Sequence, residues 1–491
     1  MSSIAQPAQS GILTHYVRYF GGNLMAVAAG FISFPLMTRL LDNHEFGILG
    51  YYEAWLLVAA GLLKLGAQHA ILRFYPHGGD PAAIQQFRSD QLLLPFALSM
   101  AFWLVAAVAV FSLIERVPAD ERPVIAVMMA MLPLLVWCSL VDSVIYALER
   151  SDIALWLRTA WRWSELVVVL ITLTWLSRSA AGVLAAKLAV LAVVAIWLAH
   201  WLQRWCRARV VRPNLAAASA GLAFGLPMMV NELTTVLFGF ADRILLRALT
   251  GNFSDVGVYT IGYGLAVAVT ALLGQTLGQA FTATAVRVYE TRGAAAVVAL
   301  KKQLLDAWVP VVAITSALLL CVGHDLLIAL AGRDKAGSAP VFVVSAITFV
   351  WYSMFGIAQY GLLLQRRAMR FLLITLLGTV VNLVLNVPLI LKFGVMGAVA
   401  ATVASHVVLA VVQYWQCPPE LRYLPRLSAL LLAALYPLPM FALLHGMDYF
   451  GLDRAIWRVL AGSVMVMLPV LLLLAISGAA RDRVRQFRQL L

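Results

Sequence analysis

The sequence predicts an all-α integral membrane protein with about fourteen transmembrane helices, arranged as two six-helix lobes and two additional C-terminal helices. Three observations predict this class: the composition, the length of the apolar runs and the distribution of Lys and Arg. Hydrophobic residues make up 63% of the chain and charged residues only 12%, with a mean hydropathy of +0.89. A soluble domain is roughly half apolar and a quarter charged. The solvent of this chain is therefore a lipid bilayer.

A helix needs about 20 mainly apolar residues to cross a bilayer. The expected spans are Thr14–Leu40, Phe46–Phe74, Gln91–Ile114, Pro123–Leu148, Ile153–Leu176, Gly182–Gln203, Leu222–Leu249, Val256–Ala283, Trp308–Ala331, Pro340–Leu364, Phe371–Leu391, Val395–Trp415, Leu427–Leu444 and Ile456–Ile476. They divide the chain into an N-terminal lobe at 1–213, a C-terminal lobe at 214–417, and two further helices with a basic tail at 418–491.

The distribution of Lys and Arg predicts the orientation. With a cytoplasmic N-terminus, 22 of the 36 Lys and Arg residues fall on the inner side, 11 on the outer side and 3 within spans. Cytoplasmic loops carry the excess of Lys and Arg, so both termini are expected to be cytoplasmic. The net charge of +13 is mostly this topology signal, with some attraction to anionic lipids, and it requires no nucleic acid.

Several functional classes are excluded or disfavoured. The four cysteines are scattered without a CxxC spacing, which indicates neither a disulfide framework nor a metal site. No loop is long enough to form a catalytic domain, and no acidic DxD pair or Ser/His/Asp grouping stands in a loop, so we expect no enzyme. A nucleotide-binding GxxxxGK[ST] loop is also missing, which disfavours ATP as the energy source.

The first twelve spans resemble two copies of six. Phe46-Gly47-Ile48 parallels Val256-Gly257-Val258, and Arg73-Phe74-Tyr75 parallels Arg287-Val288-Tyr289 in the same order. Because each copy contains an even number of spans, both copies have the same orientation in the membrane. They would then be related by an axis along the membrane normal. The transport path would then lie between the lobes.

Between Asn382 and Thr402 an apolar segment carries three polar side chains, those of Asn382, Asn386 and Thr402. The two amides are four residues apart and therefore lie on one helix face. Buried amides and hydroxyls need partners or a ligand. Two interpretations stay open, namely interhelical hydrogen bonding and a binding site.

Charged residues also occur deep in the predicted spans. Lys64, Arg162 and Lys187 lie there, and Glu165 follows Arg162 by three residues on the same helix face. Ionisable groups at such depth usually face a bundle interior or a water-filled cavity. The alternative is a structural Arg162–Glu165 pair, with the two lysines reaching toward the interface.

Several motifs resemble a known family. Thr38-Arg39-Leu40-Leu41, followed by Glu45-Phe46-Gly47, resembles the opening of the polysaccharide flippases (Wzx type) of the multidrug/oligosaccharidyl-lipid/polysaccharide (MOP) superfamily. Gly225-Leu226-Pro227 and Asp242-Arg243 are similar to the start of that family's second half. The resemblance implies alternating access and a multi-pass protein of the bacterial inner membrane. The implied substrate is an undecaprenyl-diphosphate-linked repeat unit for exopolysaccharide or O-antigen export, carried through a basic central cavity.

The resemblance also implies site residues. The expected substrate-binding residues are Arg39, Lys64, Arg162, Glu165 and Lys187. Asp242, Asn382, Asn386 and Thr402 match the cation site of the lipid II flippases, except that Asn386 replaces a carboxylate. The affinity of such a site for a coupling Na⁺ is thus expected to be lower. The alternative coupling ion is H⁺, bound by Glu232 or Asp242.

We expect no other cofactor. The expected partners are the lipid-linked oligosaccharide, membrane lipids and polysaccharide polymerase or export components. The chain itself is expected to be a monomer. The alternative functions are a multidrug or small-cation exporter of the same superfamily and a membrane enzyme of the polysaccharide pathway.

Overall fold

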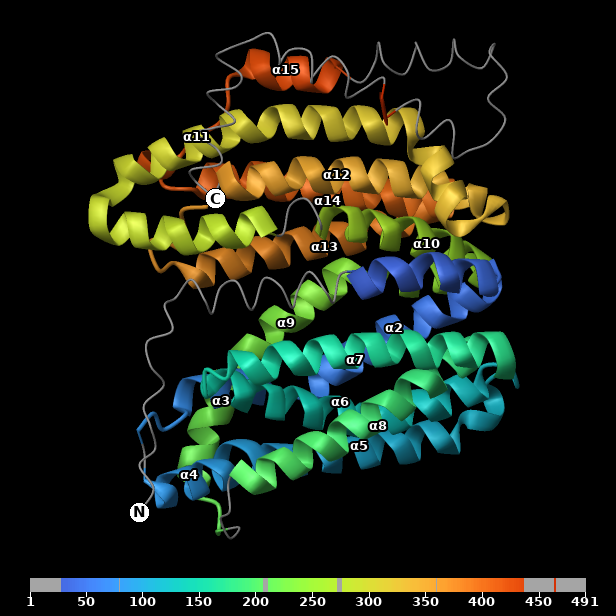
Figure 1. Cartoon of the computed structure of the whole chain (residues 1–491), viewed down its shortest axis with the longest axis vertical. Helices are drawn as coiled ribbons and strands as arrows, with labels where there is room; N and C mark the ends of the chain where they lie inside the picture. The colour runs from blue at the N-terminus through green and yellow to red at the C-terminus, as the bar shows by residue number, and fades with distance from the viewer. Residues whose placement is uncertain are drawn as a thin grey trace. The chain divides into compact units, whose positions relative to one another are not determined.

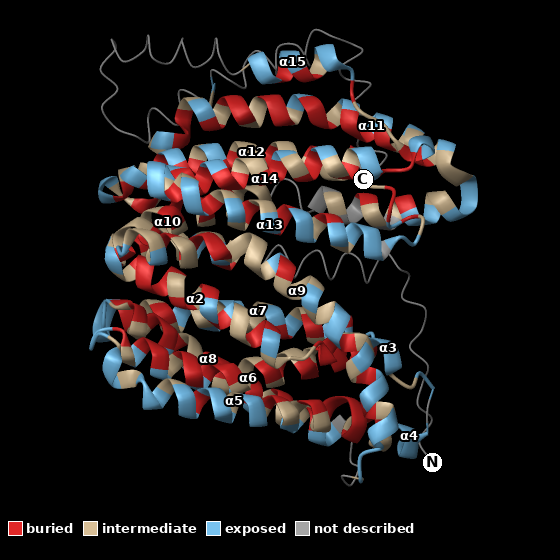
Figure 2. Cartoon of the chain, turned by 180° about the vertical axis from the view of Figure 1, so that it is seen from behind, coloured by how far each residue is buried: buried red, intermediate tan, exposed pale blue. Residues whose placement is uncertain are grey.

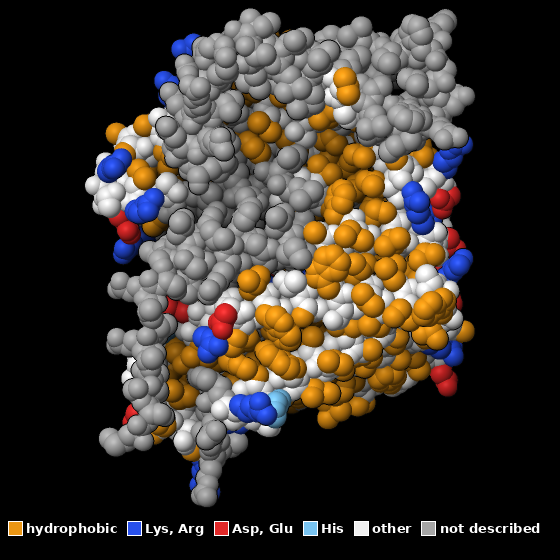
Figure 3. All heavy atoms as spheres, viewed as in Figure 1, with side chains coloured by type: hydrophobic (Ala, Val, Ile, Leu, Met, Phe, Trp, Pro, Cys, Tyr) orange, Lys and Arg blue, Asp and Glu red, His pale blue; other side chains and the backbone are white. Residues whose placement is uncertain are grey.

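The structure, a computed structural model, describes residues 28–78, 80–205, 211–271, 276–358, 360–436 and 463–464. All regular secondary structure in these ranges is helical (Figure 1). Ten helices in this part of the chain are long and apolar enough to cross a membrane. The face seen in Figure 3 is covered largely by hydrophobic side chains where it is described. The predicted class of all-α multi-pass membrane protein is confirmed.

The chain forms two compact units. The N-terminal unit comprises Met1–Leu41 and Ile48–Ile244, and the C-terminal unit comprises Asp42–Gly47 and Leu245–Leu491. The predicted boundaries at residues 213 and 417 stay predictions.

The N-terminal unit consists of long helices joined by short turns. They are a helix at 28–40, α2 (Asn43–Leu63), α3 (Ala67–Phe74), α4 (Pro81–Phe87), α5 (Leu94–Ser112), α6 (Arg122–Ala147), α7 (Ser151–Ile171), α8 (Ala180–Trp205) and α9 (Leu215–Thr250), of which α2 and α9 continue into the other unit. Proline stands in the first turn of α4 and α6, where its missing N–H has no helical partner to lose. Asp80 caps α4 by accepting a hydrogen bond from the Ala83 N–H at 2.7 Å.

The C-terminal unit has the same character. Its helices are α10 (Phe253–Thr270), α11 (Thr276–Ala331), α12 (Ala339–Ala358), α13 (Ala368–Phe393), α14 (Val395–Gln416) and α15 (Leu427–Leu435). Helix α11 is broken at Gly293, where φ is 77°. Gly394 alone, with φ 57°, separates α13 from α14. Glycine adopts this left-handed conformation without a Cβ penalty, which permits the abrupt reversal.

Ten of the fourteen predicted spans coincide with the ten membrane-length helices. The predicted span Ile153–Leu176 is helical as α7 and a π-helical turn, but its charges keep it below the hydropathy of the others. The predicted span Ile456–Ile476 and the first half of Thr14–Leu40 lie outside the described residues, apart from 463–464. Helix α15 covers the start of the predicted span Leu427–Leu444.

Burial follows the expected lipid exposure. Helix α5 leaves large apolar side chains exposed, including Phe102, Val105 and Val108, whereas α6 is buried along much of its length (Figure 2). Exposed apolar surface of this extent is costly in water but favourable in a bilayer. Helix α5 therefore faces lipid, and α6 belongs to the core of its unit.

A reciprocal glycine contact joins the first turn of α2 to α10 inside the C-terminal unit. A Cβ placed on Gly47 would clash with the carbonyl of Phe253, and one on Gly257 would clash with the carbonyl of Asn43. These are the glycines that the internal repeat pairs. Two equivalent positions that contact each other reciprocally have the pattern of a two-fold axis. The contact supports the predicted duplication.

Replacing Gly257 with alanine should destabilise the protein, because the added methyl group meets backbone that cannot rotate away. Gly239→Ala is the matched control, since no atom lies within 4 Å of its Cβ position. Alanine is favoured over glycine in a helix by about 0.5–1 kcal/mol, so the control should be neutral or stabilised. Thermal unfolding in detergent measures both, and equal midpoints for the two variants would contradict the close packing.

Candidate functional site

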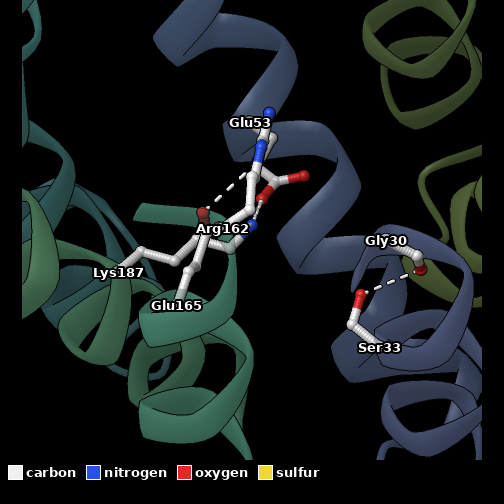
Figure 4. Close-up of polar contacts among 6 residues, drawn as sticks. All are labelled: Gly30, Ser33, Glu53, Arg162, Glu165 and Lys187. Carbon is white, nitrogen blue, oxygen red and sulfur yellow. Dashed lines mark hydrogen bonds and ion pairs between the residues drawn. The ribbon is translucent and has the colours of Figure 1, made fainter. Parts of the chain in front are cut away.

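The first charged cluster lies inside the N-terminal unit on three helices. Lys187 of α8 forms an ion pair with Glu53 of α2, and its Nζ lies 3.7 Å from Glu165 Oε1 on α7. Arg162 Nη1 lies 3.3 Å from Glu165 Oε2. Figure 4 shows the four side chains gathered between α7, α8 and α2. Two cations and two carboxylates thus neutralise one another.

Exposure distinguishes the members of this cluster. The side chain of Arg162 is 61% exposed, whereas those of Lys187 and Glu165 are 21% and 16% exposed. A charge at this depth does not face lipid without a large cost, so an exposed guanidinium indicates a water-filled space. Arg162 is the member of the cluster with donors available to a ligand.

Arg158 of α7 lies near a carboxylate of the neighbouring helix α6. Its Nη2 lies 4.0 Å from Asp142 Oδ2 on α6, and its guanidinium lies over the ring of Tyr146 at 5.1 Å. Nearer the start of α7, Arg150 hydrogen-bonds Asp152 at 2.8 Å and lowers the pKa of that carboxyl. Arg158 and Arg162 therefore have different partners: Arg158 lies near Asp142 of α6, and Arg162 pairs with Glu165 of its own helix.

The second charged cluster lies at a break between α2 and α3. Lys64 forms an ion pair with Glu232 of α9, and Gln68 Nε2 donates a hydrogen bond to the other oxygen of the same carboxylate. Leu65 and Gly66 both have positive φ, 52° and 70°. This left-handed turn ends α2 and changes the direction of the chain before α3 begins. As a result, Lys64 and Gln68, on either side of the turn, both contact the Glu232 carboxylate.

A buried polar network occupies the C-terminal unit. Asn386 Nδ2 donates to the Asn382 carbonyl at 2.9 Å and to its Oδ1 at 3.1 Å, and Asn382 Nδ2 donates to Ser405 Oγ at 3.2 Å. The hydroxyls of Thr402 and Tyr259 lie 3.4 Å apart. The structure thus brings together the three polar residues of the sequence motif, with interhelical hydrogen bonds between α13, α14 and α10.

The fourth residue of the predicted cation site belongs to the other unit. Asp242 is fully buried near the end of α9 in the N-terminal unit, beside Arg243, whose guanidinium lies over the Phe240 ring at 4.7 Å. Arg39, at the end of the helix at 28–40, is exposed. The joint site of Asp242 with the amides stays a prediction.

Two apolar pockets lie elsewhere. One, of about 410 Å³, is lined by Trp156 and Trp197 between α7 and α8, and another, of about 520 Å³, is lined by Trp351, Tyr352 and His406 between α12 and α14. Neither pocket contains the charged clusters. The groups that can recognise a charged ligand therefore lie outside the apolar pockets.

Sequence reasoning missed the carboxylate partner Glu53 and did not link Glu232 to Lys64. The signal for Glu53 was present, because a carboxylate inside an apolar span is as costly as a cation. Asp142 had the same signal inside the fourth predicted span.

Comparison with known protein families identifies the family of this chain. The model of a family described as "Polysaccharide biosynthesis protein" matches residues 16–281, which is more than half of the chain. The chain belongs to this polysaccharide biosynthesis family. No curated protein matches the chain.

Solved structures agree on the fold. The lipid II flippase MurJ in an inward closed conformation has a TM-score of 0.68 at 10% identity, over 94% of this chain and 100% of that chain. An inward-facing multidrug resistance MATE family transporter of the MOP superfamily has a TM-score of 0.64 at 14% identity, over 87% and 96%. A MOP superfamily transporter from Pyrococcus furiosus has a TM-score of 0.56 at 13% identity, over 86% and 96%. The polysaccharide-flippase resemblance of the sequence is confirmed in family and fold.

Lys187→Met should lower the free energy of unfolding in detergent by about 1–3 kcal/mol, because Glu53 and Glu165 would lose their shared cation in a partly buried site. Adding Glu53→Gln should restore part of the loss by removing one uncompensated carboxylate. Lys392→Met, at the end of α13 beside the Phe393 ring, is the control. If Lys187→Met is as stable as the parent protein, the cluster contributes nothing to the fold.

Proposed function

We propose that the protein is a flippase for lipid-linked oligosaccharides, with an undecaprenyl-diphosphate-linked repeat unit as its substrate. The observation that carries the proposal is a set of membrane-embedded cations, Lys64, Arg162 and Lys187, in a chain of the polysaccharide biosynthesis family with the MOP transporter fold. A lipid diphosphate keeps its negative charge while it crosses the bilayer. Cations along its path would offset the cost of taking that charge out of water.

Arg162 is the proposed first contact for the diphosphate, because its guanidinium is exposed and can bind two oxygens at once. Lys64 and Lys187 would follow, and Glu165 would orient Arg162. Arg39 completes the proposed substrate-binding set. The product would serve exopolysaccharide or O-antigen assembly, with polymerase and export components as partners, and the protein would act as a monomer without catalysing a chemical reaction.

The proposed location is the bacterial inner membrane, with both termini in the cytoplasm. The excess of Lys and Arg on one side of the predicted spans supports this orientation.

A second candidate, an exporter of small organic cations, is favoured by one observation. Lys64 and Lys187 are each paired with carboxylates, so the N-terminal unit also offers Glu53, Glu165 and Glu232 to a cation. The two candidates differ in the sign of the ligand charge. Transport of each ligand by the same reconstituted protein separates them.

Arg162→Ala should reduce flipping of a lipid-linked oligosaccharide in proteoliposomes at least about tenfold, since the diphosphate loses a charge-assisted contact of roughly 1.5–3 kcal/mol. Lys64→Ala should act similarly, and Lys64→Arg should keep partial activity because the charge remains. Arg150→Ala is the matched control, because its pairing with Asp152 is exposed and worth less than about 1 kcal/mol. Normal flipping by both alanine variants would remove these residues from the substrate path, and transport of an organic cation instead would favour the second candidate.

We further propose that Na⁺ or H⁺ couples to transport through Asp242 with Asn382, Asn386 and Thr402. An ion can shift a conformational equilibrium only by its differential affinity for the two states. Asp242→Asn should therefore slow flipping under an ion gradient while leaving substrate binding intact, and Asn386→Asp should preserve activity or increase its Na⁺ dependence. Flipping measured with separate Na⁺ and pH gradients tests this, with Asp255→Asn in the first turn of α10 as control. Equal rates for the parent protein and Asp242→Asn under every gradient would leave the amides with a packing role alone.

A further inference from the structure

Lys64 and Gln68 direct their donors at one carboxylate in a way that suggests a ligand site. We propose that Lys64 and Gln68 form a phosphate-binding site that Glu232 occupies in this structure. A phosphate group of the lipid diphosphate displaces the Glu232 carboxylate, which then takes up a proton. This inference rests on the proposed function, from which it takes the diphosphate as ligand.

The donors match an anion with two neighbouring oxygens. Lys64 Nζ contacts Glu232 Oε1, and Gln68 Nε2 donates to Glu232 Oε2, so each donor holds one oxygen. A phosphate presents pairs of oxygens in a similar arrangement and binds ammonium and amide donors in the same way. The carboxylate is therefore a chemical stand-in for one edge of a phosphate.

The backbone around these donors is held in an unusual conformation. Leu65 has φ 52°, in the left-handed region that costs a non-glycine residue about 1–2 kcal/mol. At Gly66, a Cβ would clash with the backbone of Gly225 on α9, so the turn is pressed against the helix that carries Glu232. Strain of this kind persists where surrounding structure fixes it, and it is concentrated at functional sites.

Charge balance makes Glu232 and a phosphate competitors. Lys64 supplies one positive charge, and the Lys64 and Glu232 side chains are 14% and 24% exposed, so the pair is partly open rather than sealed. Two anions sharing one cation in a site of low polarity repel each other. Phosphate binding therefore requires Glu232 to move away or to be neutralised.

Gln68 is placed to stabilise the neutral form of Glu232. Its side chain is buried, and its Oε1 has no hydrogen-bond partner among the described residues. The amide can accept through Oε1 while Nε2 stays with the phosphate, because the two atoms point in different directions. Glu232 takes one proton from a hydronium ion of the solvent, whose O–H bond breaks to leave a water molecule. The carboxylate becomes a carboxylic acid, and the new O–H donates to Gln68 Oε1. No other bond forms or breaks.

Within the part of the chain that the structure describes, α3 supplies further basic groups to the region around Glu232. His69 on α3 interacts electrostatically with both Glu232 and Lys64. Arg73, at the end of α3, lies 4.4 Å from the centre of the Phe224 ring, two helical turns before Glu232 on α9. His69 is thus a second titratable group at the site, and the experiment must separate it from Glu232.

The Lys187 cluster is a weaker candidate for the same exchange. Lys187 is shared between Glu53 and Glu165, so a phosphate would have to displace two carboxylates from it. At Lys64 only one carboxylate must leave.

The test measures binding of farnesyl diphosphate and of inorganic pyrophosphate to the purified full-length protein in detergent micelles between pH 5.5 and 8.5. The parent protein should bind farnesyl diphosphate more tightly as the pH falls, because protonation of Glu232 releases Lys64. Glu232→Gln keeps the shape and the Gln68 hydrogen bond but removes the competing charge. It should bind about tenfold more tightly at pH 8 and lose most of the pH dependence, a difference of about 1.4 kcal/mol.

Matched variants control for indirect effects. Asp142→Asn removes another membrane-embedded carboxylate of the same unit, the partner of Arg158, and should leave affinity and pH dependence unchanged. His69→Gln should retain the pH dependence if Glu232 is its source. Lys64→Gln should bind neither ligand at any pH. The double variant Lys64→Glu/Glu232→Lys reverses the ion pair without removing it and serves as the control for folding. Its thermal unfolding should match that of the parent protein.

The outcomes separate the two levels of the proposal. Equal affinity and equal pH dependence in the parent protein and Glu232→Gln would overturn the exchange while leaving the flippase in place. Pyrophosphate binding as tight as that of farnesyl diphosphate would assign the site to a soluble anion and overturn the lipid headgroup as its ligand. Failure of the parent protein to bind farnesyl diphosphate at any pH would overturn the proposed function itself.

Discussion

The free energy of an unpaired charge inside a bilayer is the constraint on which the N-terminal unit depends. Lys64 and Lys187 each contact a carboxylate from another helix. Removing water from a lone ammonium costs several kcal/mol, and a partner recovers much of that cost only with good geometry. The pairs therefore fix which helix faces meet, and they connect α2 with α8 and the α2–α3 turn with α9.

The same pairing changes how a basic transport path should be understood. The sequence left open whether the embedded cations are free or, for Arg162, paired with Glu165. In the described residues Lys64, Arg162 and Lys187 all have anionic partners, and Arg162 is largely exposed. A site that is neutral at rest avoids the cost of an empty, charged cavity. An anionic ligand can also displace the carboxylate from its cation. Binding and release are then exchanges of one anion for another, and the cation is never left without a partner. Exchange of this kind suits a carrier, which must release what it binds.

Much of the fold could be predicted because span length and hydropathy are local properties, and ten predicted spans coincide with helices. The reversal at Gly394 is also a local feature, because a glycine follows an apolar helix there. The pairing of Lys64 with Glu232 was not, since 168 residues separate them and no local pattern specifies which helices meet. The same holds for Glu53, which is recognisable as costly in a span but whose partner depends on packing. Sequence thus identified costly groups better than it identified their partners.

The polar clusters that the sequence motifs mark differ between the two units, although the sequence suggests that the units arose by duplication. The N-terminal unit uses ion pairs, whose members carry full charge and can change partners or protonation state. In the C-terminal unit, Asn382, Asn386 and Thr402 are neutral and hydrogen-bond one another's backbone or neighbouring hydroxyls. Neutral hydrogen bonds contribute about 0.5–1.5 kcal/mol each and respond little to pH or to an anion. An anionic ligand thus acts more strongly on these ion pairs than on the amide network, which would keep α13 and α14 together while the ion pairs of the other unit exchange.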